Sequence, residues 1–249
     1  MCSEYERRVT NMRIPLTRIQ KLIGERMLKS KLSKPCFYIE SKADVTELMA
    51  LRLKLSKSLG VKITSNAFFI RALAFAAKRY PLMLGRLENG DSSLMVEVAG
   101  NELGFTSIRI ADAINVGFPV HAPQGLVVPV VKDAHTKTMA EIGQLEKSLT
   151  EKARSNKLTL EEMQGQTIGL SNLGAYGIDS FLGIVAPPAS TILCVGNVVR
   201  TAVPANGQIA VRKITGLSLA VDHRIINGVY AAEFLNFIIE QLQNPHQLI

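Results

Sequence analysis

The sequence predicts a single α/β domain in which a layer of helices packs on a mixed β-sheet, a two-layer sandwich. The 249 residues are 47% hydrophobic and 20% charged, a balance that lets a soluble chain bury a sizeable core. Helical and strand-like segments follow one another irregularly, whereas a doubly wound nucleotide fold alternates them as β–α–β units. Length alone allows one large domain or two modest ones, but no repeat, low-complexity block or linker divides the chain. We therefore expect one domain, residues 12–249, behind a polar and basic N-terminal arm, residues 1–11.

The first third of the chain is mainly helical by its apolar spacing. Apolar residues recur at helical intervals in three segments, and Pro35 and Pro81 follow two of them. Between the first and second helices, Phe37 and Ile39 alternate with polar residues, as in a half-buried strand. The expected helices are residues 17–31, 48–59 and 67–79.

The middle of the chain is rich in β-strand patterns. Turn residues at 89–91 and 100–101 separate candidate strands, and Pro129 interrupts a later β-branched run. A proline inside a strand pattern favours an edge position or a bulge, because it donates no ladder hydrogen bond. The expected strands are residues 94–99, 104–110, 114–120 and 126–131.

The second half mixes both patterns. Helical periodicity covers residues 139–155 and one further turn at 160–163. Strand patterns follow at residues 167–171, 191–195, 209–213 and 217–221, with an Asn-Gly hairpin signal at 206–207. After the last strand, the pair Asn227-Gly228 opens an apolar helix.

Composition excludes several classes of protein. Every apolar run is too short to span a membrane, and the first residues lack the apolar core of a signal peptide. Three scattered cysteines fit reduced thiols, so we expect a cytoplasmic protein, or a mitochondrial matrix protein in a eukaryote. The net charge of +8 fits either a basic solvated face or an anionic partner such as a nucleotide-bearing cofactor. Nucleic acid is disfavoured, because no aromatic residues interleave with the basic ones.

His223 is the best candidate for chemistry among the four histidines. It follows the buried strand pattern Leu217–Val221 and lies between Asp222 and Arg224, in a place where packing alone does not explain three polar residues. A histidine there is either a general base or a structural residue. His135 and His246 lie in polar surroundings, and His121 is ambiguous.

Other kinds of site find no support in the motifs. The chain has no H-x-x-x-H, C-x-x-C or H-E-x-x-H spacing, so we expect no metal. The serine-hydrolase elbow G-x-S-x-G is absent, because Gly174 comes one residue too late after Ser171. A phosphate-binding P-loop is absent as well.

The segment Asp222-His-Arg-Ile-Ile-Asn-Gly228 resembles the D-H-R-x-x-[DN]-G motif of dihydrolipoamide acyltransferases, the core components of 2-oxo acid dehydrogenase complexes. Further segments resemble that family in the same order, and the resemblance covers nearly the whole chain from about residue 12. They are residues 14–17, 29–31, 44–46, 125–134, 160–165, 170–174 and 187–188. The resemblance implies a chloramphenicol acetyltransferase-like fold and acyl transfer between a dihydrolipoyl group and coenzyme A, with both as substrates.

The resemblance also implies a role for three residues. His223 matches the family's general base, which takes the thiol proton before attack on the thioester. Ser171 matches the hydroxyl donor that stabilises the tetrahedral oxyanion. Asn227 stands where many members have Asp, and a neutral amide orients neighbours without forming a salt bridge, so we expect it to support and position. The coenzyme A contacts stay unassigned.

The resemblance further implies a homotrimer at least, with His223 facing Ser171 of a neighbouring subunit, and shells of 24 or 60 chains. A lipoyl domain, a 2-oxo acid decarboxylase and dihydrolipoamide dehydrogenase are the implied partners, and the apolar end Leu248-Ile249 suits contacts between trimers or a frayed tail. Two departures stand out. Residues 88–112 look longer than usual, and no lipoyl or subunit-binding domain is found before residue 12. The chain is then either an excised catalytic core or a natural short form, and in a natural short form the lipoyl donor comes from another chain.

Two other functions stay open. The chain could be a non-catalytic scaffold of such a complex, although a scaffold needs neither His223 nor Ser171. It could also be a stand-alone acetyltransferase acting on a small hydroxyl compound with the same histidine. Acetyl is preferred as the acyl group, but the sequence does not exclude succinyl or branched chains.

Overall fold

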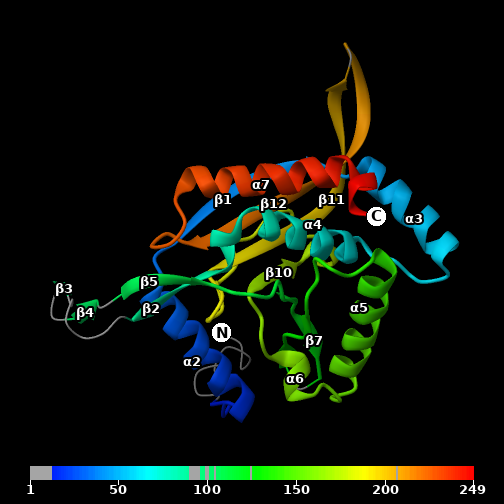
Figure 1. The fold of residues 1–249 in the computed structure, drawn as a ribbon. Coiled ribbons are helices and arrows are strands. Elements are labelled where there is room, and N and C mark those ends of the chain that lie inside the picture. The colour runs from blue at the N-terminus through cyan, green and yellow to red at the C-terminus, as the bar shows by residue number, and fades with distance from the viewer. Residues whose placement is uncertain (1–12, 90–95, 99–100, 104, 124, 206) are drawn as a thin grey trace, which may run out of the picture.

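A six-stranded sheet in the order β1-β12-β11-β10-β6-β9 forms the centre of the computed structural model, which describes residues 13–89, 96–98, 101–103, 105–123, 125–205 and 207–249 (Figure 1). Strand β10 runs parallel to β11 and β6, and the other neighbours run antiparallel, so the sheet is mixed as expected. Its strands are β1 (Cys36–Asp44), β6 (Val116–Gly117), β9 (Val130–Val131), β10 (Ile168–Asn172), β11 (Thr191–Ala205) and β12 (Gln208–Asp222).

The helices begin where the sequence places capping residues. The side chains of Thr17, Thr138 and Thr159 each accept a hydrogen bond from the backbone N–H three residues later, and the Gln or Glu side chain at that position accepts one from the backbone N–H of the cap. Such reciprocal pairs satisfy N–H groups that a helix leaves unpaired at its start. The helices are α2 (Arg18–Ser33), α3 (Thr46–Leu59), α4 (Ser65–Arg79), α5 (Met139–Arg154), α6 (Leu160–Met163) and α7 (Gly228–Gln243).

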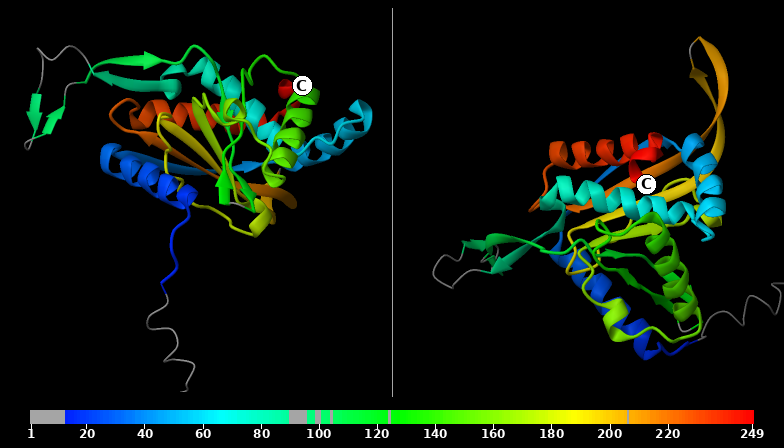
Figure 2. Two further views of the ribbon diagram at one scale, coloured as in Figure 1. Left: turned by 90° about the horizontal axis from the view of Figure 1, so that it is seen from below. Right: turned by 45° about the vertical axis from the view of Figure 1, so that its right-hand side comes forward.

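One face of the sheet carries the helical layer. Helices α4 and α7 lie side by side over it, and α3 packs beside them (Figures 1 and 2). Strand β12 turns Leu217, Leu219 and Val221 toward this layer, and all three are fully buried. Phe68 and Phe234, also fully buried, contribute the large side chains of the two central helices. Alternation along β12 thus defines a helix-covered face and an opposite face.

The opposite face is covered in part by residues 178–190 and by α2. Ser30 of α2 donates a hydrogen bond to the carbonyl of Val185 at 2.5 Å. The segment crosses the sheet so closely that a Cβ at Gly196 would lie 1.8 Å from the carbonyl oxygen of Asp179. Glycine is therefore required at residue 196 for backbone to approach backbone. This covered strip of the sheet adjoins Ser171.

Two antiparallel ribbons project from this body (Figures 1 and 2). One is the β11–β12 hairpin, whose last paired residues are Ala205 and Gln208; Asn206 of the expected turn lies outside the described residues. The other consists of β2 (Gly85–Asn89) paired with β5 (Phe105–Ile110), and beyond it β3 (Val96–Val98) pairs with β4 (Asn101–Leu103). The remaining pair is β7 (Val120–Ala122) with β8 (Gly125–Val127).

Several strand bounds differ from the sequence-based expectation. The run 126–131 divides at Pro129 into β8 and β9, and β9 lies at the sheet edge as expected for a strand next to proline. The run 114–120 also divides, into β6 and β7. The strands expected at 191–195, 209–213 and 217–221 are parts of two 15-residue strands. The expected N-terminal arm, residues 1–11, lies outside the described residues.

Among the described residues, each helix is too short or too polar to cross a lipid bilayer.

Candidate active site

The turn that carries His223 is held by the side chain before it. Asp222 is 1% exposed and accepts hydrogen bonds from Arg224 at both carboxylate oxygens, from Nε at 2.9 Å and from Nη2 at 2.7 Å. Its Oδ1 also accepts the backbone N–H of Arg224 at 3.2 Å, and Lys34 Nζ lies 3.9 Å from Oδ2. A buried carboxylate is stable when paired and hydrogen-bonded in this way. Asp222 and Arg224 therefore form a structural pair.

The imidazole of His223 is exposed at the end of this turn. Its backbone N–H donates to the carbonyl of Pro35 at 3.0 Å, which ties the turn to the start of β1. Its ring packs edge-on against Phe37, with centroids 4.9 Å apart and planes at 68°. The residue thus has a fixed backbone and an apolar support for its ring, while the side chain remains accessible to another molecule or subunit.

Asn227 is the N-cap of α7. Its Oδ1 accepts the backbone N–H of Tyr230 at 2.9 Å, which satisfies one of the unpaired donors at the helix start. The expected role was to position His223. Since the carbonyl oxygen is engaged in capping, the amide nitrogen with its two N–H donors is the group that can serve a second purpose. The cap also sets the direction in which that nitrogen can point.

Ser171 lies on β10 and is half-buried on the face opposite the helical layer. It is in register with Cys194 of β11, and Cys194 is in register with Ser218 of β12. His223 lies five residues further along the chain than Ser218 and two strands away from Ser171. At about 3.3 Å per residue and 4.8 Å per strand, the two side chains are roughly 15–20 Å apart.

That separation exceeds the reach of a hydrogen bond, about 3 Å. One chain therefore does not bring Ser171 and His223 together. The sequence expectation was that they meet across a subunit boundary, and a single chain does not test it. In this structure, the two side chains of one chain lie too far apart to form a common hydrogen-bonded site.

A cavity of about 440 Å³ adjoins the carboxyl end of β10 on the helix-covered face of the sheet, the face opposite the Ser171 side chain. Leu170 and Asn172 of β10 line it, together with residues of α4, α5 and the β6–β7 segment. A second cavity of about 330 Å³ shares Glu146, Thr150 and Arg154 with it, so the two form a continuous groove. The second cavity is also lined by Lys62, Lys147 and Glu151, so it carries both cations and carboxylates, and Lys147 Nζ lies 3.9 Å from Glu151 Oε1.

The sequence analysis missed Glu146, a carboxylate at the junction of the two cavities. It is 9% exposed and accepts a short hydrogen bond from Thr64, the N-cap of α4. Burial raises the pKa of the Glu146 carboxyl, and hydrogen bonds from Thr64 and Asn66 partly offset this effect. The available signal was its spacing, because residue 146 falls on the same helical face as the buried Ile142 and Leu149.

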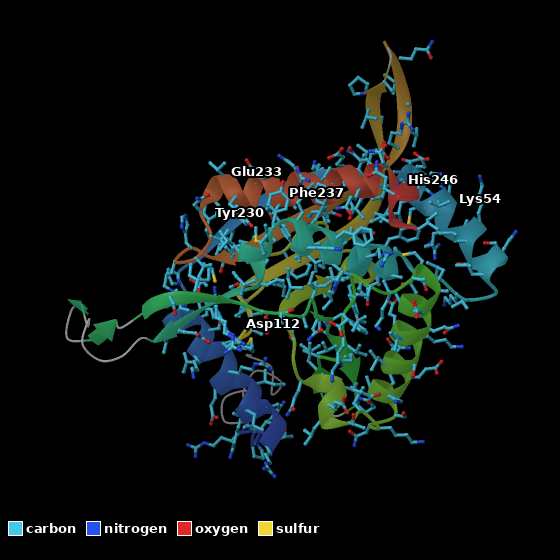
Figure 3. All side chains as sticks on the ribbon, viewed as in Figure 1. Lys54, Asp112, Tyr230, Glu233, Phe237 and His246 are labelled. Atoms are coloured by element: carbon cyan, nitrogen blue, oxygen red, sulfur yellow. The ribbon has the colours of Figure 1, made fainter. Side chains whose placement is uncertain are left out.

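The other histidines lie apart from this turn. His246 follows the far end of α7 from Tyr230, and its imidazole lies 3.4 Å from Glu47 of α3 (Figure 3). His135 offers its carbonyl to Arg71, while His121 lines the larger cavity. Only His121 therefore gains a candidate functional place from the structure. Within the described ranges, no three His, Cys, Asp or Glu side chains gather as a metal site would require.

Comparison with known families gives a match over residues 9–249 to the catalytic domain of 2-oxoacid dehydrogenases acyltransferase. The chain is 34% identical over 235 residues to the dihydrolipoyllysine-residue acetyltransferase component of the pyruvate dehydrogenase complex of Rickettsia bellii, covering 93% of this chain and 52% of that protein. It is 32% identical to the succinyltransferase component of the 2-oxoglutarate dehydrogenase complex of Haemophilus influenzae, covering 95% of this chain and 55% of that protein. The chain thus spans about half the length of these relatives.

Solved structures agree with the sequence comparisons. The dihydrolipoamide acetyltransferase of Azotobacter vinelandii superposes with a TM-score of 0.86 at 28% identity, covering 99% of this chain and 97% of that one. That structure addresses the role of a serine, a histidine and an asparagine in the catalytic mechanism. A chloramphenicol acetyltransferase superposes with a TM-score of 0.51 at 15% identity over 88% of this chain and 92% of that one, which shows a shared fold.

Proposed function

The chain belongs to the family of 2-oxoacid dehydrogenase acyltransferases, and on that premise we propose that it transfers an acyl group between a dihydrolipoyl group and coenzyme A. The observation that carries the proposal is the set Ser171, His223 and Asn227. These residues recur at the same sequence intervals as the serine, histidine and asparagine addressed in the Azotobacter vinelandii enzyme. In this chain Ser171 lies on β10, His223 lies in the turn after β12, and Asn227 caps α7.

His223 is the general base in this proposal. A thiol near pH 7 is mostly protonated, and only its thiolate attacks a thioester efficiently. The imidazole takes the proton from the coenzyme A thiol as the new carbon–sulfur bond forms at the acyl carbonyl. When the tetrahedral intermediate collapses, the bond to the lipoyl sulfur breaks and the imidazolium returns the proton to that sulfur. Protons and electron pairs balance without a further reactant.

Ser171 and Asn227 support that transfer. The Ser171 hydroxyl, from the neighbouring subunit, donates a hydrogen bond to the oxyanion, where one such donor contributes about 3 kcal/mol to transition-state stabilisation. The amide nitrogen of Asn227 orients groups around His223, while its oxygen remains in the helix cap. The distance between Ser171 and His223 in one chain supports a site that two subunits share. Such a site fits the trimer that the resemblance implies.

The remaining partners follow from the relatives. A lipoyl domain brings the second thiol, and a 2-oxo acid decarboxylase and dihydrolipoamide dehydrogenase complete the complex, in the cytoplasm or the mitochondrial matrix. Trimers associate further into shells of 24 or 60 chains. Acetyl is the proposed acyl group, since the Rickettsia bellii relative is an acetyltransferase, with succinyl as the alternative.

The test is the rate of acyl transfer from acetyl-, succinyl- and isobutyryl-coenzyme A to dihydrolipoamide. We expect transfer by the wild type and a loss of about 10²–10⁴-fold in kcat for His223→Ala, because that is the typical contribution of a general base. His246→Ala is the matched control, since this exposed histidine lies away from the turn and the groove.

Three results would contradict the proposal. Wild-type turnover by His223→Ala would exclude His223 as the base. Assembly without transfer from any of the three thioesters would favour a scaffold. Acetylation of a small alcohol, but not of dihydrolipoamide, would establish the stand-alone acetyltransferase.

A further inference from the structure

Phe37 lies beside His223 because of the register in which β1 pairs with β12. Phe37 is directly opposite Val221, and His223 comes two residues later. Residues two apart on a strand share a face, and a diagonal neighbour across two strands is within reach of an aromatic ring. The backbone N–H of His223 donates to the carbonyl of Pro35, which continues this pairing just past the end of β12. The sheet itself thus brings the ring of Phe37 next to the imidazole.

The contact with Phe37 holds the imidazole in one orientation. The ring centroids are 4.9 Å apart and the planes meet at 68°, an edge-on arrangement that aromatic pairs favour. Within the described part of the chain, neither ring nitrogen of His223 has a hydrogen-bond partner, although its backbone N–H has one. The torsion that rotates an imidazole about its bond to Cβ has only broad minima. Packing against Phe37, and not a hydrogen bond, therefore sets the orientation of the ring in this structure.

Phe37 is itself held on its other side by the start of α7. A Cβ built at Gly228, the first residue of that helix, would lie 3.6 Å from Cε1 and Cζ of the Phe37 ring. The ring is half-buried and packs against the hydrophobic core. Side chains in a close-packed core have little room to move. Phe37 is therefore a firm support that lies between the imidazole and the helix that Asn227 caps.

We propose that Phe37 is a positioning residue for His223, whose ring fixes the rotation of the imidazole so that a ring nitrogen faces the thiol from which it takes the proton. The proposal rests on the function proposed above, in which His223 is the general base. A general base works only when it lies within hydrogen-bond reach of the proton, about 3 Å, and is aligned with it. Phe37 acts through His223 and touches neither substrate.

Removal of the aromatic ring should lower kcat and leave KM unchanged. An imidazole without this support samples several rotations, so a smaller fraction of the enzyme has the nitrogen in place. Neither substrate loses a contact, so KM for the thioester and for dihydrolipoamide should stay the same. A residue needed only for folding would instead lower the amount of active protein and leave kcat per active site unaltered.

The experiment measures kcat and KM for transfer to dihydrolipoamide from the thioester that the wild type uses best. Phe37→Leu keeps an apolar side chain without the ring, and we expect it to lose about two- to tenfold in kcat, the effect of one aromatic contact. Phe37→Met is a second variant in case leucine disturbs the packing, because an unbranched side chain adapts to irregular space. It should lose kcat to a similar extent.

Phe75→Leu is the matched control. Phe75 is also half-buried and packed against the core, but its ring centroid lies 4.2 Å from Cζ of Arg71 and not beside an imidazole. We expect this variant to lose unfolding free energy in urea as Phe37→Leu does and to keep the kcat of the wild type. An equal loss of kcat in both variants would overturn the proposal, because loosened packing anywhere in the core would then explain it.

A double-mutant cycle tests whether Phe37 acts through His223. In the His223→Ala background, Phe37→Leu should cause no further loss of the residual transfer, because no imidazole is left to orient. The same fold loss in both backgrounds would overturn the proposal, since the ring would then contribute independently of the base.

The outcomes separate this inference from the proposed function. Wild-type kcat in folded Phe37→Leu and Phe37→Met overturns the inference and leaves the function standing. A raised KM with unchanged kcat also overturns it, because Phe37 would then contact a substrate. A wild-type chain that transfers no acyl group from any of the three thioesters overturns both.

Discussion

Asp222 shows how one buried residue prepares an exposed one. Its two carboxylate oxygens hold the guanidinium and the backbone N–H of Arg224, so the turn is tied down on both sides of His223. Desolvating a carboxylate is costly, and the bidentate pair offsets that cost only in a precise geometry. The charge of Asp222 is thus engaged by Arg224, and the imidazole of His223 remains exposed beside it.

Cys194 is a thiol beside the candidate oxyanion donor, but its surroundings make it unreactive. Burial raises its pKa to about 12, although a backbone hydrogen bond at Gly183 opposes this shift. The thiolate is the reactive form, so at pH 8 almost all of this residue is inert thiol. We expect iodoacetamide to leave Cys194 unmodified in the native protein at pH 8 and to label it after unfolding, as peptide mass spectrometry would detect.

Cys36 provides the internal comparison for this prediction. Burial and the negative charge of Asp222 raise its pKa as well, but the residue is partly exposed, so it should be labelled before Cys194. The same shift in pKa also makes the folding stability depend on pH. Because the pKa of Cys194 in the folded protein lies above its ordinary value of 9.0, the contribution of Cys194 to folding stability is complete below pH 9. It is lost as the pH rises toward 12. Native labelling of Cys194 as fast as a free thiol would contradict the assignment.

At the scale of the element, Asn227 has two separable tasks. Its oxygen caps α7, and its nitrogen is the proposed support for His223. We expect Asn227→Ala to lose about 1 kcal/mol of unfolding free energy through the missing cap. Asn227→Ser keeps a capping oxygen and should retain that stability. Both variants lack the amide donors, so both should lose acyl transfer to a similar extent.

Urea unfolding and steady-state kinetics on the same two variants check this separation. If Asn227→Ser were as active as the wild type, the amide nitrogen would have no catalytic role, and capping would explain the residue. If both variants were equally destabilised, the cap would not depend on a side-chain oxygen. Either result would revise a single task of Asn227 without affecting the other.

Helices were the part of the fold that the sequence predicted best, because their signals are local. Thr138 and Glu141 lie three residues apart, and together they form the capping box at which α5 begins. Strand bounds were predicted less well, since a strand extends as far as its partner does. The outer part of β11, Val198–Ala205, pairs only with β12 and extends beyond the part of the sheet that the helices cover. The prediction relied on a pattern of buried residues, so it ended the strand too early, at Val195.

The residues of the candidate site also differ in whether a local signal predicts them. His223, Ser171 and Asn227 were found because each lies in a motif that can be read along the chain. The place of Phe37 beside His223 was not found, because it depends on the pairing of β1 with β12, and periodicity gives no information about which strands pair.

On the scale of the whole molecule, large apolar side chains are exposed on several of the described elements, among them α2 and the projecting hairpin. On α2, Leu22, Leu28 and Leu32 are 56%, 60% and 79% exposed, and on the projecting hairpin Ile209 and Val211 are 82% and 67% exposed. Gathered apolar residues on a protein surface usually mark contact sites. A single chain thus leaves apolar side chains exposed and leaves Ser171 and His223 apart. Both observations favour the proposed assembly.

Complementation between two inactive variants tests whether the site is shared. His223→Ala retains a normal Ser171, and Ser171→Ala retains a normal His223. In a cyclic trimer each site takes its histidine from one subunit and its serine from the next. Every trimer that contains both variants then has one site with both native residues, so about one third of wild-type activity should return. Co-expression with two different tags and purification through both would isolate these mixed trimers.

The matched control is co-expression of His223→Ala with His223→Gln, which restores no site in any arrangement and should remain inactive. If the mixed trimers of His223→Ala and Ser171→Ala were no more active than the parent variants, Ser171 and His223 would not meet across a boundary. The roughly 15–20 Å between them in one chain would then have to be closed by a rearrangement of β10 relative to β12. Those strands are joined through β11 by continuous backbone pairing, which makes such a movement costly and the shared site the simpler reading.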